Sequence, residues 1–191
     1  MKSHPLLILE TLDRHLSAPF DLYVYGRSAL ALGFPTAPEA MHATLDVDAI
    51  LPTRDLLAIE ANEDFWRAQE ATNRELDPTG LYFTHLFEER QVILGRGWHE
   101  RVVPLGMSGF TKLSLFRPST EDLVLTKMMR VDPQDREDVL FLIQQPDLCL
   151  RRLRELIALA SVPPVAEIRE AFEKNQLWLA PLLDRASTPS C

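Results

Sequence analysis

Two aspartates separated by one residue lie within an apolar run, and their types and spacing are suited to binding a metal ion. In the stretch "TLDVDAIL", Asp46 and Asp48 flank a valine. Because alternate side chains of a β-strand point to opposite faces, the two carboxylates would project together, opposite Leu45, Val47 and Ala49. Neighbouring carboxylates repel each other, and Mg²⁺ bound together with substrate phosphates would offset that repulsion. An edge strand with a polar outer face would give the same pattern.

A glycine and a serine precede the aspartates in the stretch "FDLYVYGRSALALGF". The alternation in "FDLYVY" predicts a strand that ends before Gly26, and "RSALALGF" has the composition of a helix. A glycine at such a junction lets the backbone approach a ligand closely. The N-terminus of the helix and the Ser28 hydroxyl can then hold phosphate oxygens. An ordinary turn between a strand and a helix is the alternative interpretation.

The order of these features resembles the signature of the nucleotidyltransferase superfamily, typified by DNA polymerase β and the minimal nucleotidyltransferases. In that signature a hydrophobic residue, a glycine, a small residue and a serine precede Asp-x-Asp. Gly26 and Ser28 match it, and so do Asp46 and Asp48. Arg27 departs from the commoner small residue and would alter how the phosphates lie.

A second block, "STEDLVLTKMMRVDPQDREDVLFLI", extends the resemblance. It is similar to the Asp-Leu-x-x-x-Lys and Asp-x-x-Asp block of bacterial nucleotidyltransferases related to the AbiEii toxins. On a helical wheel of about 100° per residue, Lys127 falls within the apolar arc, and Asp135 and Asp138 fall in and beside the arc of the next helix. A lysine whose stem packs while its amine reaches water, and an aspartate favoured by the helix dipole, remain alternatives.

The resemblance implies an enzyme that moves a nucleoside monophosphate from an NTP to a hydroxyl acceptor with the help of Mg²⁺ or Mn²⁺. The acceptor could be a tRNA, a protein or a small molecule. The catalytic residues implied are Asp46, Asp48, Lys127, Asp135 and Asp138. The implied nucleotide-binding positions are Gly26, Arg27, Ser28 and Lys127. Asp135 and Asp138 would support Lys127, or one of them would help deprotonate the acceptor.

Active members of the superfamily usually carry a third carboxylate on a later strand. The candidates here are Glu88, Glu89 and Glu100, and we take Glu89 as the metal ligand beside Asp46 and Asp48. A solvated charge pair at a hairpin turn is the alternative. The alternative is a degenerate site without catalysis. The chain would then bind a cognate partner protein in a toxin–antitoxin or phage-defence pair.

The pattern of elements predicts an α+β fold, a nucleotidyltransferase-like mixed sheet flanked by helices. We expect a core over residues 1–117 and a helical C-terminal part over 118–191. Residues 54–76 have the length and composition of one helix, and "PTAPEAMH" is expected to form a loop. Later strands are predicted in "LYFTHLF", "QVILG", "RVVPL" and "KLSLF". Ser119 or Thr120 is a suitable N-cap, and Pro133 suits the first turn of a helix.

Composition limits the remaining possibilities. The 191 residues carry a formal charge of −8, which argues against a protein that coats nucleic acid and favours a protein or small-molecule acceptor. No apolar run approaches the roughly 18 residues of a membrane span. Cys149 and Cys191 are too few for a disulfide framework, so a reduced, cytoplasmic setting is the default expectation.

Overall fold

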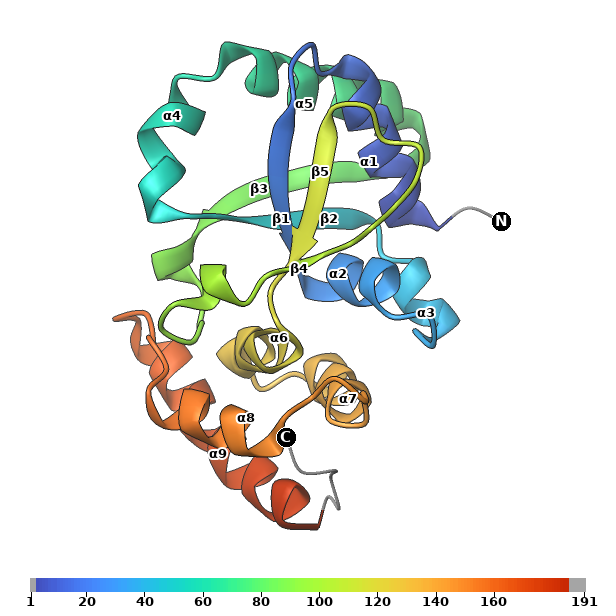
Figure 1. Ribbon diagram of the computed structural model, residues 1–191. Coiled ribbons are helices and arrows are strands. Elements are labelled where there is room, and N and C mark those ends of the chain that lie inside the picture. The colour runs from blue at the N-terminus through green and yellow to red at the C-terminus, as the bar shows by residue number, and fades with distance from the viewer. Residues whose placement is uncertain (1–2, 186–191) are drawn as a thin grey trace. The chain divides into compact units, whose positions relative to one another are not determined.

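A computed structural model describes residues 3–185, apart from the side chain of His85. The described residues form two compact units. The first comprises the residues up to 88 together with 102–117, and the second comprises 89–101 and the residues from 118 onward. The predicted α+β class is confirmed, with a mixed sheet and flanking helices (Figure 1). The expected division of the chain at residue 117 stays a prediction.

A five-stranded sheet in the order β3-β2-β1-β5-β4 is the frame of the first unit. The central strand β1 (Phe20–Tyr25) runs antiparallel to β2 (Asp46–Leu51) and parallel to β5 (Leu113–Arg117). On the outer sides, β3 (Tyr82–Glu88) pairs in parallel with β2, and the short β4 (Val103–Pro104) pairs antiparallel with β5. The sheet is therefore mixed, as the resemblance implied.

One face of this sheet is covered by α1 (His4–His15) and α5 (Glu63–Leu76), which also pack on each other. Phe65 of α5 stacks on Phe20 of β1 and meets Phe83 of β3 edge-on, with ring centroids 4.4 and 6.2 Å apart. The side chains directed to this face are buried: Phe20, Leu22, Val24, Val47, Ala49, Phe83, Leu113 and Leu115. The alternating positions of β1 and β2 include half-exposed side chains, so the polar residues of these strands lie on the other face.

Two further helices follow β1 and lead to β2. The first, α2 (Gly26–Gly33), packs against both strands, and α3 (Glu39–His42) packs on α2. The expectation of a loop throughout "PTAPEAMH" was wrong for its last four residues, which form α3. Pro38 precedes this single turn in an extended conformation, the geometry of a residue flanking a helix start.

The single helix expected over residues 54–76 is divided. A 3-10 turn, η1 (Thr53–Asp55), leads into the short α4 (Leu56–Glu60), and α5 begins separately. Asn62 causes the break: its side-chain oxygen accepts a hydrogen bond from the Phe65 backbone N–H at 3.0 Å. An asparagine that satisfies a donor at a helix N-terminus favours a new start over continuation.

The second unit is mainly helical. Its main helices, with one 3-10 turn, are α6 (Thr120–Thr126), η5 (Lys127–Met129), α7 (Pro133–Leu142), α8 (Leu150–Ala158) and α9 (Ala166–Arg185). The predicted cap is confirmed at Ser119, whose hydroxyl accepts from the Asp122 N–H at 3.1 Å. Pro133 lies in the first turn of α7 as predicted. The cap of that helix, which the sequence analysis did not identify, is Asp132, which accepts from the Gln134 N–H at 2.8 Å.

The strand predicted in "QVILG" was wrong. A 3-10 turn, η3 (Glu89–Gln91), is followed by irregular backbone in which only Leu94 pairs, through a single bridge to Ser161. Val92, Ile93 and Leu94 are nonetheless buried. A short buried apolar run has no period that separates a strand from a packed loop. Another 3-10 turn, η4 (Trp98–Glu100), closes the segment.

Within residues 3–185, no helix combines the length and the apolar composition needed to cross a bilayer. Cys191, one of the two cysteines of the chain, lies outside the described residues.

Asp13 of α1 joins this helix to the start of β5. Its buried carboxylate accepts hydrogen bonds from the backbone N–H groups of Thr111, Lys112 and Leu113 at 2.8 to 3.1 Å. Burial raises the pKa of the Asp13 carboxyl, but the hydrogen bonds from Leu113, Lys112 and Thr111 outweigh burial and hold the pKa below its usual value.

We expect Asp13→Asn to lower the free energy of unfolding near neutral pH by about 1–3 kcal/mol, since hydrogen bonds to a buried charge are lost. A carboxyl whose pKa is lower in the folded chain stabilises it above the unfolded-state pKa, and this stabilisation is lost as pH falls through the folded-state pKa. Urea unfolding at decreasing pH should therefore show the gap between wild type and variant closing in acid.

Asp64→Asn is the matched control, because the exposed Asp64 carboxylate also accepts hydrogen bonds from Ser17 and Ala18. Water can replace those bonds, so this variant should lose less stability. A gap between wild type and Asp13→Asn that stays constant down to the acid transition would contradict the assignment.

Candidate functional site

Asp46 and Asp48 lie half-exposed on β2, on the sheet face that α1 and α5 leave uncovered. Val47 and Ala49 are fully buried on the opposite face, as the strand alternation predicts. Leu45 does not share that burial: it precedes the strand and is 53% exposed. The two carboxylates therefore project together from a face with access to solvent.

Gly26 brings the start of α2 next to Asp48. Its φ of +67° lies in the left-handed region, which glycine adopts without the penalty that a side chain brings. Tyr25, the preceding residue, pairs with Asp48 across β1 and β2. A Cβ atom added to Gly26 would lie 3.5 Å from Oδ2 of Asp48. The turn backbone and the carboxylate are thus close neighbours.

Ser28 and Thr44 fix the position of Asp46. Ser28 is 2% exposed, and its hydroxyl donates to the backbone carbonyl of Asp46 at 2.6 Å. The Thr44 hydroxyl donates to Oδ1 of Asp46 at 2.9 Å. Since the one hydroxyl proton of Ser28 is engaged, this side chain ties α2 to β2, and its expected contact with phosphate stays a prediction. The sequence analysis missed Thr44, although a threonine two residues before an aspartate is a recognisable local partner.

A β-bulge lies opposite Asp48. Val47 pairs with Phe83, but Ala49 pairs with Leu86, so β3 has one residue more than β2 over this interval. The Thr84 hydroxyl donates to the Val47 carbonyl at 3.1 Å within the bulge. Bulges bend a strand and redirect side chains, and they are frequent beside active sites. The sequence contains no pattern that predicts this bulge.

Aromatic side chains flank Asp48 on the same face. The rings of Tyr25 and Phe87 meet edge-on with centroids 5.8 Å apart, and those of Tyr23 and Phe116 stack at 5.5 Å. Tyr23 and Tyr25 alternate with buried residues along β1, as the sequence "LYVY" would have allowed us to see. The carboxylates therefore lie beside flat surfaces suited to packing against a ligand.

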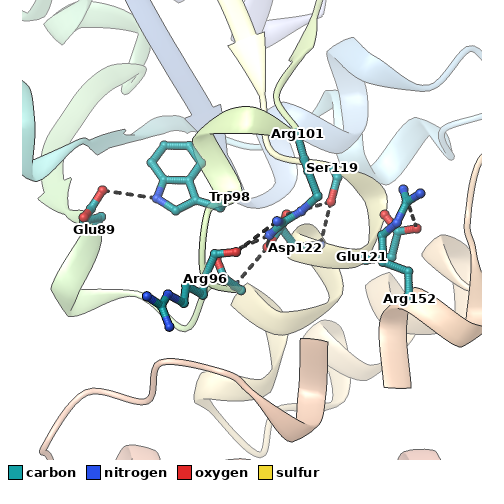
Figure 2. Close-up of polar contacts among 9 residues, drawn as sticks. Glu89, Arg96, Trp98, Arg101, Ser119, Glu121, Asp122 and Arg152 are labelled. Atoms are coloured by element: carbon teal, nitrogen blue, oxygen red, sulfur yellow. Dashed lines mark hydrogen bonds and ion pairs between the residues drawn. The ribbon is translucent and has the colours of Figure 1, made fainter. Parts of the chain in front are cut away.

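The donor set of Asp46 and Asp48 fits Mg²⁺, which typically takes one or two carboxylates and completes its shell with substrate phosphates and water. Within the described residues, no three acidic, histidine or cysteine side chains gather into a metal site. Glu89 belongs to the second unit, where its Oε2 accepts a hydrogen bond from Nε1 of Trp98 at 3.2 Å (Figure 2). Its role as a third ligand stays a prediction.

Lys127 lies within a buried ion cluster in the second unit. Its amine is 3.1 Å from Oδ1 of Asp135 and 2.7 Å from Oδ2 of Asp138, and the lysine side chain is only 7% exposed. The exposed Arg130 pairs with the other oxygen of Asp135 at 3.0 Å. The inward direction predicted for Lys127 agrees with this burial. Two cations and two carboxylates balance each other within the cluster.

Asn175 of α9 holds the turn that carries Lys127. Its side-chain amide donates to the backbone carbonyls of Met128 at 3.2 Å and Arg130 at 2.8 Å, and Asn175 is buried. These carbonyls belong to the end of η5, where the helical hydrogen-bonding pattern stops. The sequence analysis found no motif after Ile143, and an isolated asparagine on a helix gives no signal of such a role.

Asp122 is the centre of a second buried cluster (Figure 2). Arg101 contacts both of its oxygens at 3.0 Å, the Ser119 hydroxyl donates to Oδ2 at 2.7 Å, and the Gly95 N–H donates to Oδ1 at 2.9 Å. A Cβ atom at Gly95 would lie 2.9 Å from the same Oδ1, so a side chain would displace the loop. Asp122 thereby fastens residues 95–101 to α6.

Comparison with protein families agrees with these features. The model of a family described as "Nucleotidyltransferase of unknown function (DUF6036)" matches residues 8–177. The chain belongs to this family. The match includes both the Gly26–Asp48 region and the Lys127 cluster of the DUF6036 chain. The resemblance to nucleotidyltransferases is confirmed at this level, and the closer relation to AbiEii-like toxins stays a prediction.

No curated protein and no solved structure matches the chain. The description of the family says that its members are nucleotidyltransferases, but it specifies neither substrate nor acceptor.

We expect Lys127→Met to lower the free energy of unfolding by about 3–5 kcal/mol, because it takes from the buried carboxylate of Asp138 the amine that contacts it, whereas Asp135 keeps Arg130. The double variant Lys127→Met/Asp138→Asn should lose less than the single variant, since it also removes the charge of Asp138. Urea unfolding of Lys127→Met, Asp138→Asn and the double variant gives the coupling energy between Lys127 and Asp138.

Lys174→Met is the control for this prediction. Lys174 is exposed and pairs with Glu170 one helical turn away on α9. Its replacement should change stability by no more than about 0.5 kcal/mol. If Lys127→Met cost as little as Lys174→Met, the buried cluster would have no energetic significance.

Proposed function

We propose that this protein transfers a nucleoside monophosphate from an NTP to a hydroxyl acceptor with the help of Mg²⁺ or Mn²⁺. One observation carries the proposal: the turn at Gly26 lies directly beside Asp48, on the face from which Asp46 and Asp48 project together. Membership of a nucleotidyltransferase family makes this juxtaposition of a candidate phosphate turn and two carboxylates meaningful.

Different residues of the first unit would bind the metal ion and the phosphates. Asp46 and Asp48 would hold the divalent ion, which when bound supplies positive charge to the triphosphate and the departing pyrophosphate. The backbone at Gly26 and Arg27 would approach the phosphates at the N-terminus of α2, where backbone N–H groups and the helix dipole favour anions. Ser28 and Thr44 keep Asp46 in place through its carbonyl and its carboxylate.

A tRNA end, a protein side chain and a small molecule all carry a hydroxyl that could serve as the acceptor. The formal charge of −8 favours a protein or a small molecule, because a nucleic acid is generally held by a basic surface. The resemblance also assigned a role in the reaction to Lys127, Asp135, Asp138 and Glu89. These four roles stay predictions.

A second candidate function is a catalytically degenerate domain that binds a cognate partner in a toxin–antitoxin or defence system. Two observations favour it. Arg27 replaces the small residue of the superfamily signature, and the amine of Lys127 is held by Asp135 and Asp138. Nucleotide binding distinguishes the two candidates.

Calorimetric titration of each NTP, with and without Mg²⁺, tests the proposal on wild type, Asp46→Asn and Asp48→Asn. We expect metal-dependent binding of at least one NTP and a loss of about tenfold or more in each variant, which corresponds to about 1.4 kcal/mol. Asp77→Asn, which alters an acidic residue in the separate 3-10 turn Asp77–Thr79, should bind as wild type does.

Unchanged Mg²⁺-dependent binding and NTP turnover in Asp48→Asn would overturn the proposed site. If wild type bound none of the four nucleotides, the partner-binding function would be the one to pursue.

Gly26→Ala and Gly80→Ala form a matched pair of variants. Both glycines have a left-handed φ, of +67° and +70°, so each alanine should cost about 1–2 kcal/mol of folding stability. A Cβ atom at Gly80 meets no other atom within 4 Å, whereas one at Gly26 lies beside Asp48. We expect thermal unfolding to show similar losses and titration to show weaker NTP binding only for Gly26→Ala. Equal NTP binding by the two variants would remove Gly26 from the site.

A further inference from the structure

A pocket of about 570 Å³ opens in the first unit along β1 and β2. Its volume lies within the range typical of small-molecule sites, about 300–1,000 Å³. Strands β1, β2 and β3 contribute to its lining, and so do the segments η1 and α4 that follow β2. Its lining includes the side chains of Asp21, Tyr23, Ile50, Arg54 and Ile59. None of the residues assigned to catalysis or nucleotide binding lines it.

The strand register places this pocket on one side of Asp48 and the phosphate turn on the other. Tyr25 pairs with Asp48, and Tyr23 pairs with Ile50, two residues further along the same face. Two residues of a strand span about 7 Å. Gly26 follows Tyr25 in the opposite direction and lies against Asp48. Asp46 lies on the same side as the turn, where Ser28 of α2 contacts its carbonyl. The order along the face is therefore the phosphate turn with Asp46, then Asp48, then the pocket.

We propose that this pocket is the acceptor subsite, an inference that rests on the function proposed above. In phosphoryl and nucleotidyl transfer, the attacking oxygen and the leaving oxygen lie roughly in line on opposite sides of the phosphorus. With the pyrophosphate at the Gly26 turn and the α-phosphate beside Asp48, the attacking oxygen approaches from the side of the pocket.

The transfer balances without a further reagent. The acceptor oxygen forms a bond to the α-phosphorus while the bond from that phosphorus to the oxygen bridging to the β-phosphate breaks. Pyrophosphate leaves with the electron pair, and the acceptor's hydroxyl proton passes to water. The pocket only has to orient the acceptor and bring its hydroxyl to the carboxylate end.

The lining favours a small acceptor with an apolar or flat body and without negative charge. Tyr23, Ile50 and Ile59 offer ring and aliphatic surface. Arg54 is paired with Asp55 at 3.4 Å, so its charge is already offset. The exposed Asp21 adds a negative charge at the rim. A nucleic acid strand would meet no excess of basic residues here, and phosphate binding depends on such residues.

Two probes of nearly equal shape test this specificity. Tyramine carries a phenolic hydroxyl, a flat body and an ammonium group, whereas 4-hydroxyphenylacetate has a carboxylate in place of the ammonium. We expect calorimetry on the full chain to show tyramine binding at least about tenfold more tightly than 4-hydroxyphenylacetate. Asp21→Asn should reduce that preference, because it removes the negative charge at the rim.

Filling the pocket tests its position. Ile59→Trp should weaken tyramine binding by about tenfold or more and leave Mg²⁺-dependent NTP binding unchanged. Leu57→Trp is the matched control, since Leu57 is on the same short helix but is 79% exposed and does not line the pocket. Leu57→Trp should bind tyramine and the NTP as wild type does. Transfer of label from an α-³²P-labelled NTP to tyramine should follow the same order.

The outcomes separate the two proposals. If wild type binds an NTP through Asp48 but does not bind tyramine, or if Ile59→Trp binds tyramine as well as wild type, the acceptor subsite is wrong and the nucleotide site stands. If Ile59→Trp abolishes NTP binding while Leu57→Trp does not, the pocket holds part of the nucleotide, which also overturns the inference. NTP binding that is insensitive to Asp48→Asn refutes the function itself.

Discussion

Asp46 and Asp48 place two like charges on one face of the same strand, about 7 Å apart along it, and the surroundings of both residues reduce that repulsion. The face is half-exposed, so water screens the charges. Thr44 donates to the Asp46 carboxylate, and the start of α2, with its partial positive charge, lies beside Asp48. A strand end with these compensations tolerates two carboxylates before any ligand arrives, and a divalent ion with a triphosphate would complete the neutralisation.

The position of that strand end depends in turn on packing at the opposite face. Val47 and Ala49 are fully buried against the helices, so β2 cannot slip by one residue without burying both charges. The bulge in β3 and the hydrogen bond from Ser28 to the Asp46 carbonyl fix the remaining freedom. The core thus positions the carboxylates as strictly as any contact between the site residues themselves.

The second unit handles buried charge by pairing every member of its clusters. Asp122 is satisfied by Arg101, Ser119 and Gly95, and Lys127 by two carboxylates of α7. Removing one partner from such a cluster costs more than the cluster itself contributes. The lysine of the motif block therefore has a structural reason to be present, whether or not it also meets a phosphate.

What the sequence by itself determined is mostly local: the period of two that sends Asp46 and Asp48 to one face, the helix starts at Ser119 and Pro133, and, from the order of such elements, the α+β class. Caps and alternation act within a few residues, so a short window contains them entirely. Only the tertiary structure decided that the buried stretch before Gly95 forms no strand. It also decided that the Ser28 hydroxyl bonds to the Asp46 carbonyl and that the Asn175 amide bonds to the turn that carries Lys127. These outcomes depend on partners far along the chain, and burial satisfies an apolar or polar side chain without leaving a period in the sequence.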